Sequence, residues 1–329
     1  MTTVATPLLW TAFAVFLLIA LAVDLLVMNR KGAHRVGLRE AGLWSLVWVV
    51  LALLFNLGLW WWLRGQADAH HASEVAMEFL AGYVIEKALA VDNIFVFLML
   101  FNRFAVPAEQ QQRVLVLGVL MAIVLRALMI LVGAVLIARF HWILYVFGVF
   151  LLVTGLRMLR QEEHSPDPGR SRLMVWLQKH LPLTGRYEDG ALRVRENGRW
   201  LYTPLFLVIV LVGITDLIFA VDSIPAIFAI TLDPFVVLTS NVFAVLGLRA
   251  MYFLLAGMAD RFHLLNRGLA MVLVFIGGKM LLLEVYKIPI GIALGIVALL
   301  IGGSIVLSLL RPPPARPDTV QRATRKPPA

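Results

Sequence analysis

Two apolar stretches of the chain carry the same arrangement of carboxylates, and these are the residues that could do chemistry. Residues 86–95 read E-K-A-L-A-V-D-N-I-F, and residues 216–225 read D-L-I-F-A-V-D-S-I-P. In each stretch an acid precedes A-V-D, and an amide or hydroxyl residue follows. A carboxylate at the centre of a membrane helix costs roughly 2.5–3.5 kcal/mol to insert. Four such groups predict a functional site.

The two motifs offer oxygen atoms as ligands. Carboxylate, amide and hydroxyl oxygens suit Mg²⁺, Ca²⁺ and Mn²⁺. All seven histidines lie at or outside the expected membrane spans and the chain has no cysteine, which argues against a zinc, nickel or copper site within the membrane. The predicted metal-handling residues are Glu86, Asp92, Asn93, Asp216, Asp222 and Ser223.

Helix geometry decides how these groups could meet. Glu86 and Asp92 would lie about 9 Å apart along one helix, so a single ion cannot bridge them there. If the two motif helices run antiparallel, Glu86 lies level with Asp222, and Asp92 lies level with Asp216. The geometry therefore predicts two stacked carboxylate pairs, with the neighbouring amide and hydroxyl supplying neutral oxygens.

Basic residues also fall at membrane depth, and they allow a second interpretation. Four cations could form four buried ion pairs with no ligand at all, but such pairs seldom gain more than they lose in desolvation. We expect instead that the cations hold the carboxylates ionised when the site is empty and release them when a divalent ion or protons arrive. The predicted charge-balancing residues are Lys87, Arg126, Arg249 and Lys279.

The composition requires a membrane to position these residues. The chain has 329 residues, of which 61% are hydrophobic and 15% charged. Apolar runs of about 20 residues recur along it, the length that a helix needs to cross a bilayer. The sequence therefore predicts an all-α, polytopic membrane bundle of about nine helices. The expected spans are 7–28, 41–63, 76–101, 114–137, 141–159, 204–230, 235–256, 267–286 and 289–310.

The chain divides into segments around these spans. Residues 1–75 hold two N-terminal spans, 76–160 a first three-helix unit, and 204–288 a second. Residues 161–203 form a basic connection in which an amphipathic surface helix is expected at Ser171–His180. Residues 289–310 are the last span, and the Pro- and Arg-rich residues 311–329 are expected to be a disordered tail.

The net charge of +9 comes from short connections between spans. This is where orientation signals belong, so we expect contact with the lipid bilayer and no nucleic-acid partner. Odd-numbered connections are richer in Lys and Arg than even-numbered ones. The positive-inside rule then places the N-terminus outside and the C-terminus in the cytoplasm.

The two three-helix units match beyond their acidic motifs. Leu125–Ala127 corresponds to Leu248–Ala250, and the G-x-R-M-L at 155–159 corresponds to the G-x-K-M-L at 277–281. Three spans separate equivalent helices, so the units must cross the membrane in opposite directions. Inverted repeats of this kind characterise secondary transporters, whose site lies at the repeat interface.

On these motifs, Glu86–Asn93 and Asp216–Ser223, the chain resembles the TerC family of integral membrane proteins, most closely its Alx-type members. The span layout extends the resemblance over nearly the whole chain. The resemblance implies a manganese(II) exporter of a bacterial cytoplasmic membrane. It also implies that the four acids handle the metal, with Asn93 and Ser223 in support.

The leading hypothesis is thus a secondary transporter that exports a divalent metal, most plausibly Mn(II), as its transported ion and without an organic cofactor. No Walker motif points to ATP, and no nucleophile or zinc-protease motif points to an enzyme. Two alternatives stay open: export of another small charged solute, with Arg126 and Arg249 as clamps, and a non-transporting membrane partner in metal or stress response. Homo-oligomerisation is left open by the sequence.

Overall fold

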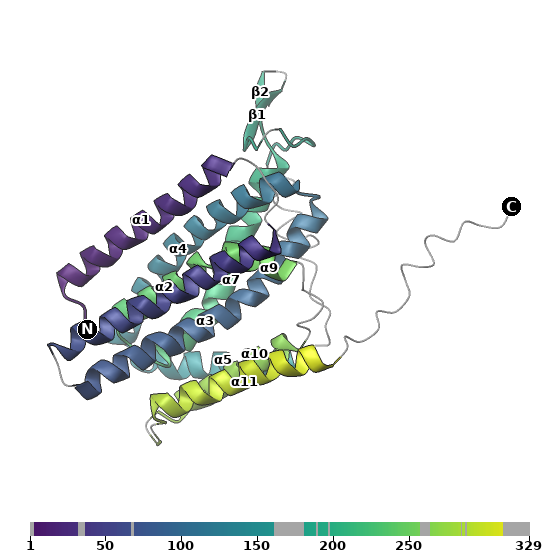
Figure 1. Ribbon diagram of the computed structural model, residues 1–329. Coiled ribbons are helices and arrows are strands. Elements are labelled where there is room, and N and C mark those ends of the chain that lie inside the picture. Colours follow the sequence, from purple (N-terminus) through teal and green to yellow (C-terminus); the bar gives the residue numbers. More distant parts are fainter. Residues whose placement is uncertain are drawn as a thin grey trace.

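Long helices form a bundle, and one small hairpin extends beyond it (Figure 1). The computed structural model describes residues 3–31, 37–66, 69–160, 181–188, 190–196, 198–256, 264–283, 285–286 and 288–311. The helices in these ranges are α1 (Pro7–Lys31), α2 (Leu38–Arg64), α3 (Ala69–Arg103), α4 (Ala108–Arg139), α5 (Ile143–Arg160), α7 (Pro204–Phe228), α8 (Pro234–Leu246), α9 (Leu248–Ala256), α10 (Leu265–Leu281) and α11 (Ile290–Leu310). The hairpin pairs β1 (Arg193–Glu196) with β2 (Arg199–Tyr202) in antiparallel register.

Each predicted span has a helical counterpart among the described residues, with α8 and α9 forming one bent span. Five helices are long and apolar enough to cross a bilayer, namely α2, α4, α5, α7 and α11, and the α8–α9 pair makes a sixth candidate. Large apolar side chains such as Trp61 and Leu299 lie exposed on the outside of the bundle, as a lipid-facing surface requires. The expected all-α, polytopic membrane bundle is confirmed.

The two repeat units pack on each other reciprocally. α3 contacts α7, α4 contacts α8, and α5 contacts α10. In addition, α3 contacts α8 just as its counterpart α7 contacts α4. Exchanging the two units leaves this set of contacts unchanged, which is what an inverted repeat requires.

Glycines let α5 and α10 approach closely in opposite directions. A Cβ atom added to Gly277 would lie 2.7 Å from the carbonyl oxygen of Gly148, and one added to Gly155 would lie 2.7 Å from that of Ala270. A later residue of α5 thus contacts an earlier residue of α10, so the two helices are antiparallel. Small residues are the usual means of close helix packing in membranes.

The seventh span is broken at Gly247, a feature that the sequence analysis did not predict. α8 and α9 meet there at an angle of 41°. Close to the break, Nζ of Lys87 donates to the carbonyl of Ala244 at 3.1 Å. A side chain from α3 therefore satisfies a backbone group that lipid could not.

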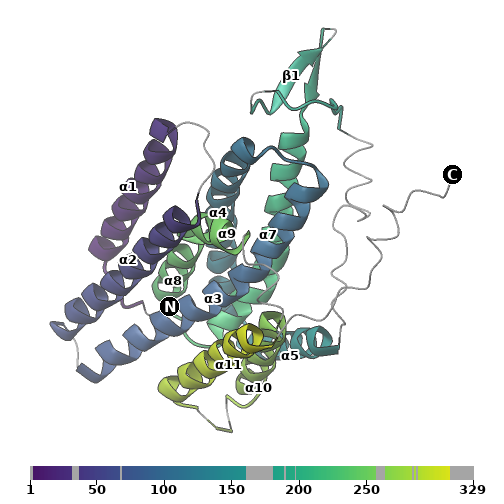
Figure 2. The same ribbon diagram turned by 45° about the vertical axis from the view of Figure 1, so that its right-hand side comes forward.

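The connection between the repeat units also contains unpredicted structure. β1 and β2 extend past the end of the bundle at which α7 begins, in both views (Figures 1 and 2). Tyr187 Oη donates to the carbonyl of Phe104 at 2.7 Å, and the ring of Tyr202 stacks on Phe206 at 4.4 Å. These contacts hold the connection against the helix ends. The helix expected at Ser171–His180 and the residues after 311 lie outside the described part of the chain.

Candidate ion site at the repeat interface

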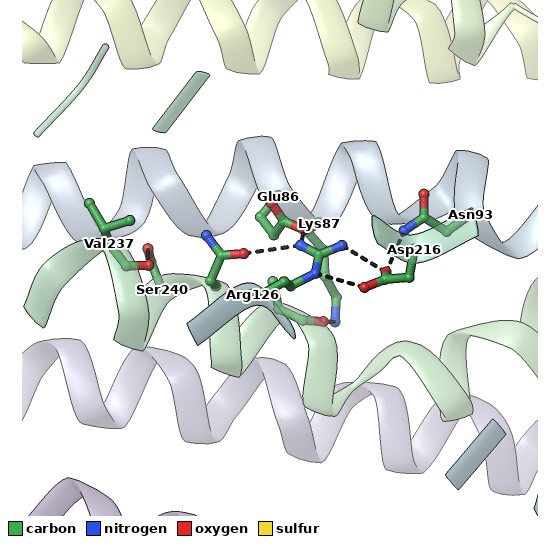
Figure 3. Close-up of polar contacts among 9 residues, drawn as sticks. Glu86, Lys87, Asn93, Arg126, Asp216, Val237 and Ser240 are labelled. Carbon is green, nitrogen blue, oxygen red and sulfur yellow. Dashed lines mark hydrogen bonds and ion pairs between the residues drawn. The ribbon is translucent and has the colours of Figure 1, made fainter. Parts of the chain in front are cut away.

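Arg126 lies at the centre of a buried group of polar side chains (Figure 3). Its side chain, 2% exposed, forms an ion pair with Glu86 of α3. It holds Asp216 of α7 at two points, with Nε donating to Oδ2 at 3.3 Å and Nη2 donating to Oδ1 at 3.0 Å. Nη1 donates to Oδ1 of Asn241 on α8 at 3.0 Å. Four helices, two from each repeat unit, thus meet at one guanidinium group.

Asn93 completes this group by linking α3 to α7. Its Nδ2 donates to Oδ1 of Asp216 at 3.3 Å. We call the five residues the charge network: Glu86, Asn93, Arg126, Asp216 and Asn241. Within it two carboxylates share one arginine, so with standard ionisation the network carries one net negative charge.

The helix register behind the predicted carboxylate pairs is present. Asn93 lies beside Asp216, and a Cβ atom added to Gly82 would lie 3.5 Å from Cγ2 of Ile227, so α3 and α7 run antiparallel with Glu86 near the level of Asp222. The carboxylate pairs themselves stay predictions, because the side chain of Asp92 is outside the described part of the structure. The described partner of both Glu86 and Asp216 is Arg126.

Several buried polar atoms of this region have no hydrogen-bond partner among the described residues. Glu86, Asn93, Ser223 and Asn241 are each at most 1% exposed. The unpartnered atoms are Oε2 of Glu86, Oδ1 of Asn93, Oγ of Ser223 and Nδ2 of Asn241. Buried polar atoms normally have a partner, because an unpaired one costs about 1–3 kcal/mol. Three of these four atoms are oxygens, the ligand type that a hard cation needs.

A small cavity adjoins the charge network on the side of α5 and α10. Its volume is about 40 Å³, enough for a water molecule or an ion. Asn93 and Arg126 belong both to the network and to the cavity wall, and Asp222 and Ser223 of α7 also line it. The remaining lining residues are Leu89, Met158, Phe219, Leu269 and Leu273. We refer to this space as the central cavity.

The other predicted residues are placed as follows. Lys87 points away from the carboxylates to the break after α8, where it also lies 5.7 Å from the ring centre of Tyr83. Lys279 lines a separate, mainly apolar pocket beside Ile85. Arg249 is on α9 and partly buried. Asp92 lies on α3, but its side chain is outside the described part of the structure.

Asn241 is a member of the charge network that the sequence analysis missed. It belongs to the polar run Thr239–Asn241 inside an otherwise apolar span. That run is the signal that could have found it, because amides are rare at this depth unless they bond to another helix. All three side chains of the run are buried.

A wide vestibule opens at the end of the bundle where α3 begins and α7 ends. Its volume is about 550 Å³. Its polar lining comes from His71, Glu74, Glu78, His141 and Asp233, with Thr3 and Val4 at the edge. Among the described residues, no three His, Asp or Glu side chains are close enough to form a metal site, here or in the charge network. The wall of the vestibule combines these charged and polar side chains with apolar ones such as Ile137 and Phe228.

The opposite end of the bundle is sealed by apolar side chains. Leu100, Phe101, Leu205 and Tyr252 are buried together there, and the connection that carries Tyr187 packs against them. Tyr252 Oη also donates to Oε1 of Gln111 at 3.1 Å. The charge network thus lies between an open polar vestibule and a closed apolar layer.

Bundle and network together define a polytopic integral membrane protein with charged residues buried at the interface of two inverted repeats. Comparison of the sequence with known families identifies it further. Residues 71–314 match the integral membrane protein TerC family, and the chain belongs to that family.

Relatives match along nearly the full length of the chain. It is 57% identical over 297 residues to an Escherichia coli (strain K12) protein provisionally named membrane-bound redox modulator Alx, covering 90% of this chain and 92% of the relative. It is 46% identical to an uncharacterized membrane protein of Myxococcus xanthus, covering 94% of each chain, and 36% identical to one of Rickettsia felis, covering 92% and 97%. The predicted TerC membership of the Alx type is confirmed. No solved structure matches the chain.

Proposed function

We propose that this protein is a secondary transporter that exports a divalent metal ion, with Mn²⁺ as the main substrate, from the bacterial cytoplasm. The observation that carries the proposal is the set of unpartnered oxygens beside two carboxylates at the repeat interface. A cation in the central cavity would satisfy Oδ1 of Asn93 and Oγ of Ser223, with Asp222 as the adjoining carboxylate. The expected likeness to manganese-exporting members of the family agrees with this ligand set.

Arg126 supplies a way to bind and release the ion. In the described conformation its guanidinium pairs with both Glu86 and Asp216. A divalent cation that enters beside Asn93 competes for the same carboxylates, and repulsion between the two cations favours withdrawal of the arginine. The arginine side chain returns when the ion leaves, so the two buried carboxylates always have a cationic partner. Protons could serve as the exchanged ion by the same competition.

The predicted orientation is compatible with the proposed export. With the N-terminus outside, the vestibule lined by Glu74 and Glu78 faces the periplasm, and the apolar seal around Phe101 and Tyr252 faces the cytoplasm. The polar vestibule then receives the ion that leaves the central cavity. Alternating access requires the seal to open while the vestibule closes.

The size of the central cavity disfavours an organic substrate. About 40 Å³ accommodates an ion or a water, whereas pockets for small organic ligands usually measure 300–1,000 Å³. Arg126 is also already engaged by two carboxylates, so it is not presented as a clamp for an anion. A metal ion therefore fits the described geometry better than a charged organic solute.

The name of the Alx relatives mentions redox modulation, and export of a metal can account for it. This chain has no cysteine, so it cannot use a thiol or a disulfide. Transition-metal ions themselves take part in redox chemistry, and a protein that sets their concentration modulates that chemistry without containing a redox group.

The test is Mn²⁺ flux into or out of vesicles that contain the purified full-length protein, followed with an entrapped metal-sensitive dye. Asp216→Asn and Asp222→Asn should each reduce the flux at least tenfold. Glu109→Gln, which neutralises an exposed acid at the start of α4, is the matched control and should leave the flux unchanged. Parent-level flux in both Asn variants, with normal folding, would show that the proposed site is wrong.

A further inference from the structure

One lining residue of the central cavity, Met158, carries a sulfur atom that could contact a metal ion. Met158 reaches the cavity from α5, beside Asn93, Asp222 and Ser223. Its repeat counterpart, Met280 of α10, is fully buried in the hydrophobic core and is absent from the cavity lining. The two methionines occupy equivalent sequence positions but differ in what they face.

We propose that Met158 determines the metal specificity of this site by disfavouring Ca²⁺ and Mg²⁺ relative to transition-metal ions. The proposal rests on the transport function proposed above. It adds a thioether to a ligand set of one carboxylate, one amide oxygen and one hydroxyl.

The chemistry behind this inference is the match between donor and cation. A thioether is a soft, polarisable donor, whereas Mg²⁺ and Ca²⁺ bind almost entirely through oxygen. An ion that enters a cavity of about 40 Å³ must give up most of its water molecules. If a sulfur atom takes the place of an oxygen ligand in the cavity wall, Mg²⁺ and Ca²⁺ lose bound water molecules and gain no oxygen ligand in return. Mn²⁺ also prefers oxygen, but as a transition-metal ion it is softer than Mg²⁺ and Ca²⁺, so the contact with sulfur costs it less free energy.

Its position and flexibility suit Met158 to this role. Its side chain is only partly buried, in contrast to the 0% exposure of Met280. Methionine has an unbranched chain with three rotatable bonds, so it can follow an ion of varying size. The neighbouring lining residues Leu89, Leu269 and Leu273 cannot coordinate a metal at all.

The experiment compares competition by Ca²⁺ and Mg²⁺ against Mn²⁺ flux in vesicles that contain the full-length protein. Met158→Leu keeps the volume and removes the sulfur. We expect the Ca²⁺ concentration that halves the Mn²⁺ flux of this variant to be about tenfold lower than the concentration that halves the flux of the parent. Met158→Gln, which places an oxygen in the same position, should shift the competition in the same direction.

Met280→Leu is the matched control and should leave the competition unchanged. If neither Met158 variant that folds and transports Mn²⁺ alters the Ca²⁺ or Mg²⁺ competition by more than twofold, the assignment of specificity to Met158 is refuted, and the transport function stands. If the parent protein moves no Mn²⁺ above the level of protein-free vesicles, the transport function is refuted and this inference falls with it.

Discussion

Replacing Arg126 by methionine tests whether the arginine and a metal ion compete for the same carboxylates. The substitution keeps an unbranched side chain and removes a guanidinium that pairs with Glu86 and Asp216 and bonds to Asn241. Loss of one partner of a buried ion pair costs about 3–5 kcal/mol, because the remaining charge stays buried. In metal-free buffer the variant should therefore unfold roughly 5–10 °C below the parent.

Mn²⁺ should reverse this defect. In the parent the ion must displace the arginine, whereas in Arg126→Met the two carboxylates are free to bind it. We expect the variant to bind Mn²⁺ at least tenfold more tightly, a difference of about 1.4 kcal/mol. Thermal unfolding followed by the fluorescence of the nine tryptophans, over a range of Mn²⁺ concentrations, reports both effects. Transport by this variant should still be slow, because it lacks the guanidinium group that would displace the bound ion from the carboxylates.

Lys87→Met is the control for a general change of charge. Lys87 follows Glu86 in α3, but its ammonium group bonds to the carbonyl of Ala244 and not to a carboxylate among the described contacts. This variant should not bind Mn²⁺ more tightly than the parent. If Arg126→Met and the parent gain equal thermal stability from Mn²⁺, the competition that we propose does not occur.

Three further outcomes follow from the fold. Gly155→Val should destabilise the protein by about 1–3 kcal/mol, because a Cβ atom added there meets the backbone of Ala270. Gly302→Val is the control, because a Cβ atom added to Gly302 meets no atom within 4 Å. Thermal unfolding of the two variants measures the difference in stability. Tyr187→Phe removes one hydrogen bond, so a protease added to the cytoplasmic side should cleave the connection faster than in the parent. Leu232→Cys, in a chain without other cysteines, should react with an impermeant maleimide from the periplasmic side; reaction only from the cytoplasmic side would reverse the predicted orientation.

The sequence predicts the helices of this fold well because the bilayer allows few alternatives. Apolar runs of fixed length and their backbone hydrogen bonding determine where each span lies, and the helices α1 to α11 follow the predicted spans within a few residues, apart from longer ends on α3 and α4. The bend at Gly247 was not predicted, because a glycine within an apolar run does not by itself distinguish a break from a close contact. The β1–β2 hairpin was missed because a short polar segment carries little periodicity.

The candidate site was predicted by residue type but not by pairing. Carboxylates and arginines in apolar spans are conspicuous, so Glu86, Arg126 and Asp216 could be found without coordinates. Which acid meets which cation depends on helix rotation and crossing, and a change of one residue in register moves a side chain by 100° around its helix. The sequence therefore named Arg126 as one of four charge-balancing residues, but not the two acids that it joins.

The two repeat units pack differently, and this difference is a structural reason to expect two conformations. Arg126 and Arg249 occupy equivalent positions in the repeat, yet Arg126 is 2% exposed within the continuous helix α4, and Arg249 is partly buried on α9, just after the break at Gly247. Two units of similar sequence that pack differently can exchange their packing at little cost in free energy. In the transporter that we propose, exchange of the two packings would open the seal as the vestibule closes. An inverted repeat would thus supply both end states of the proposed transport cycle from one set of contacts.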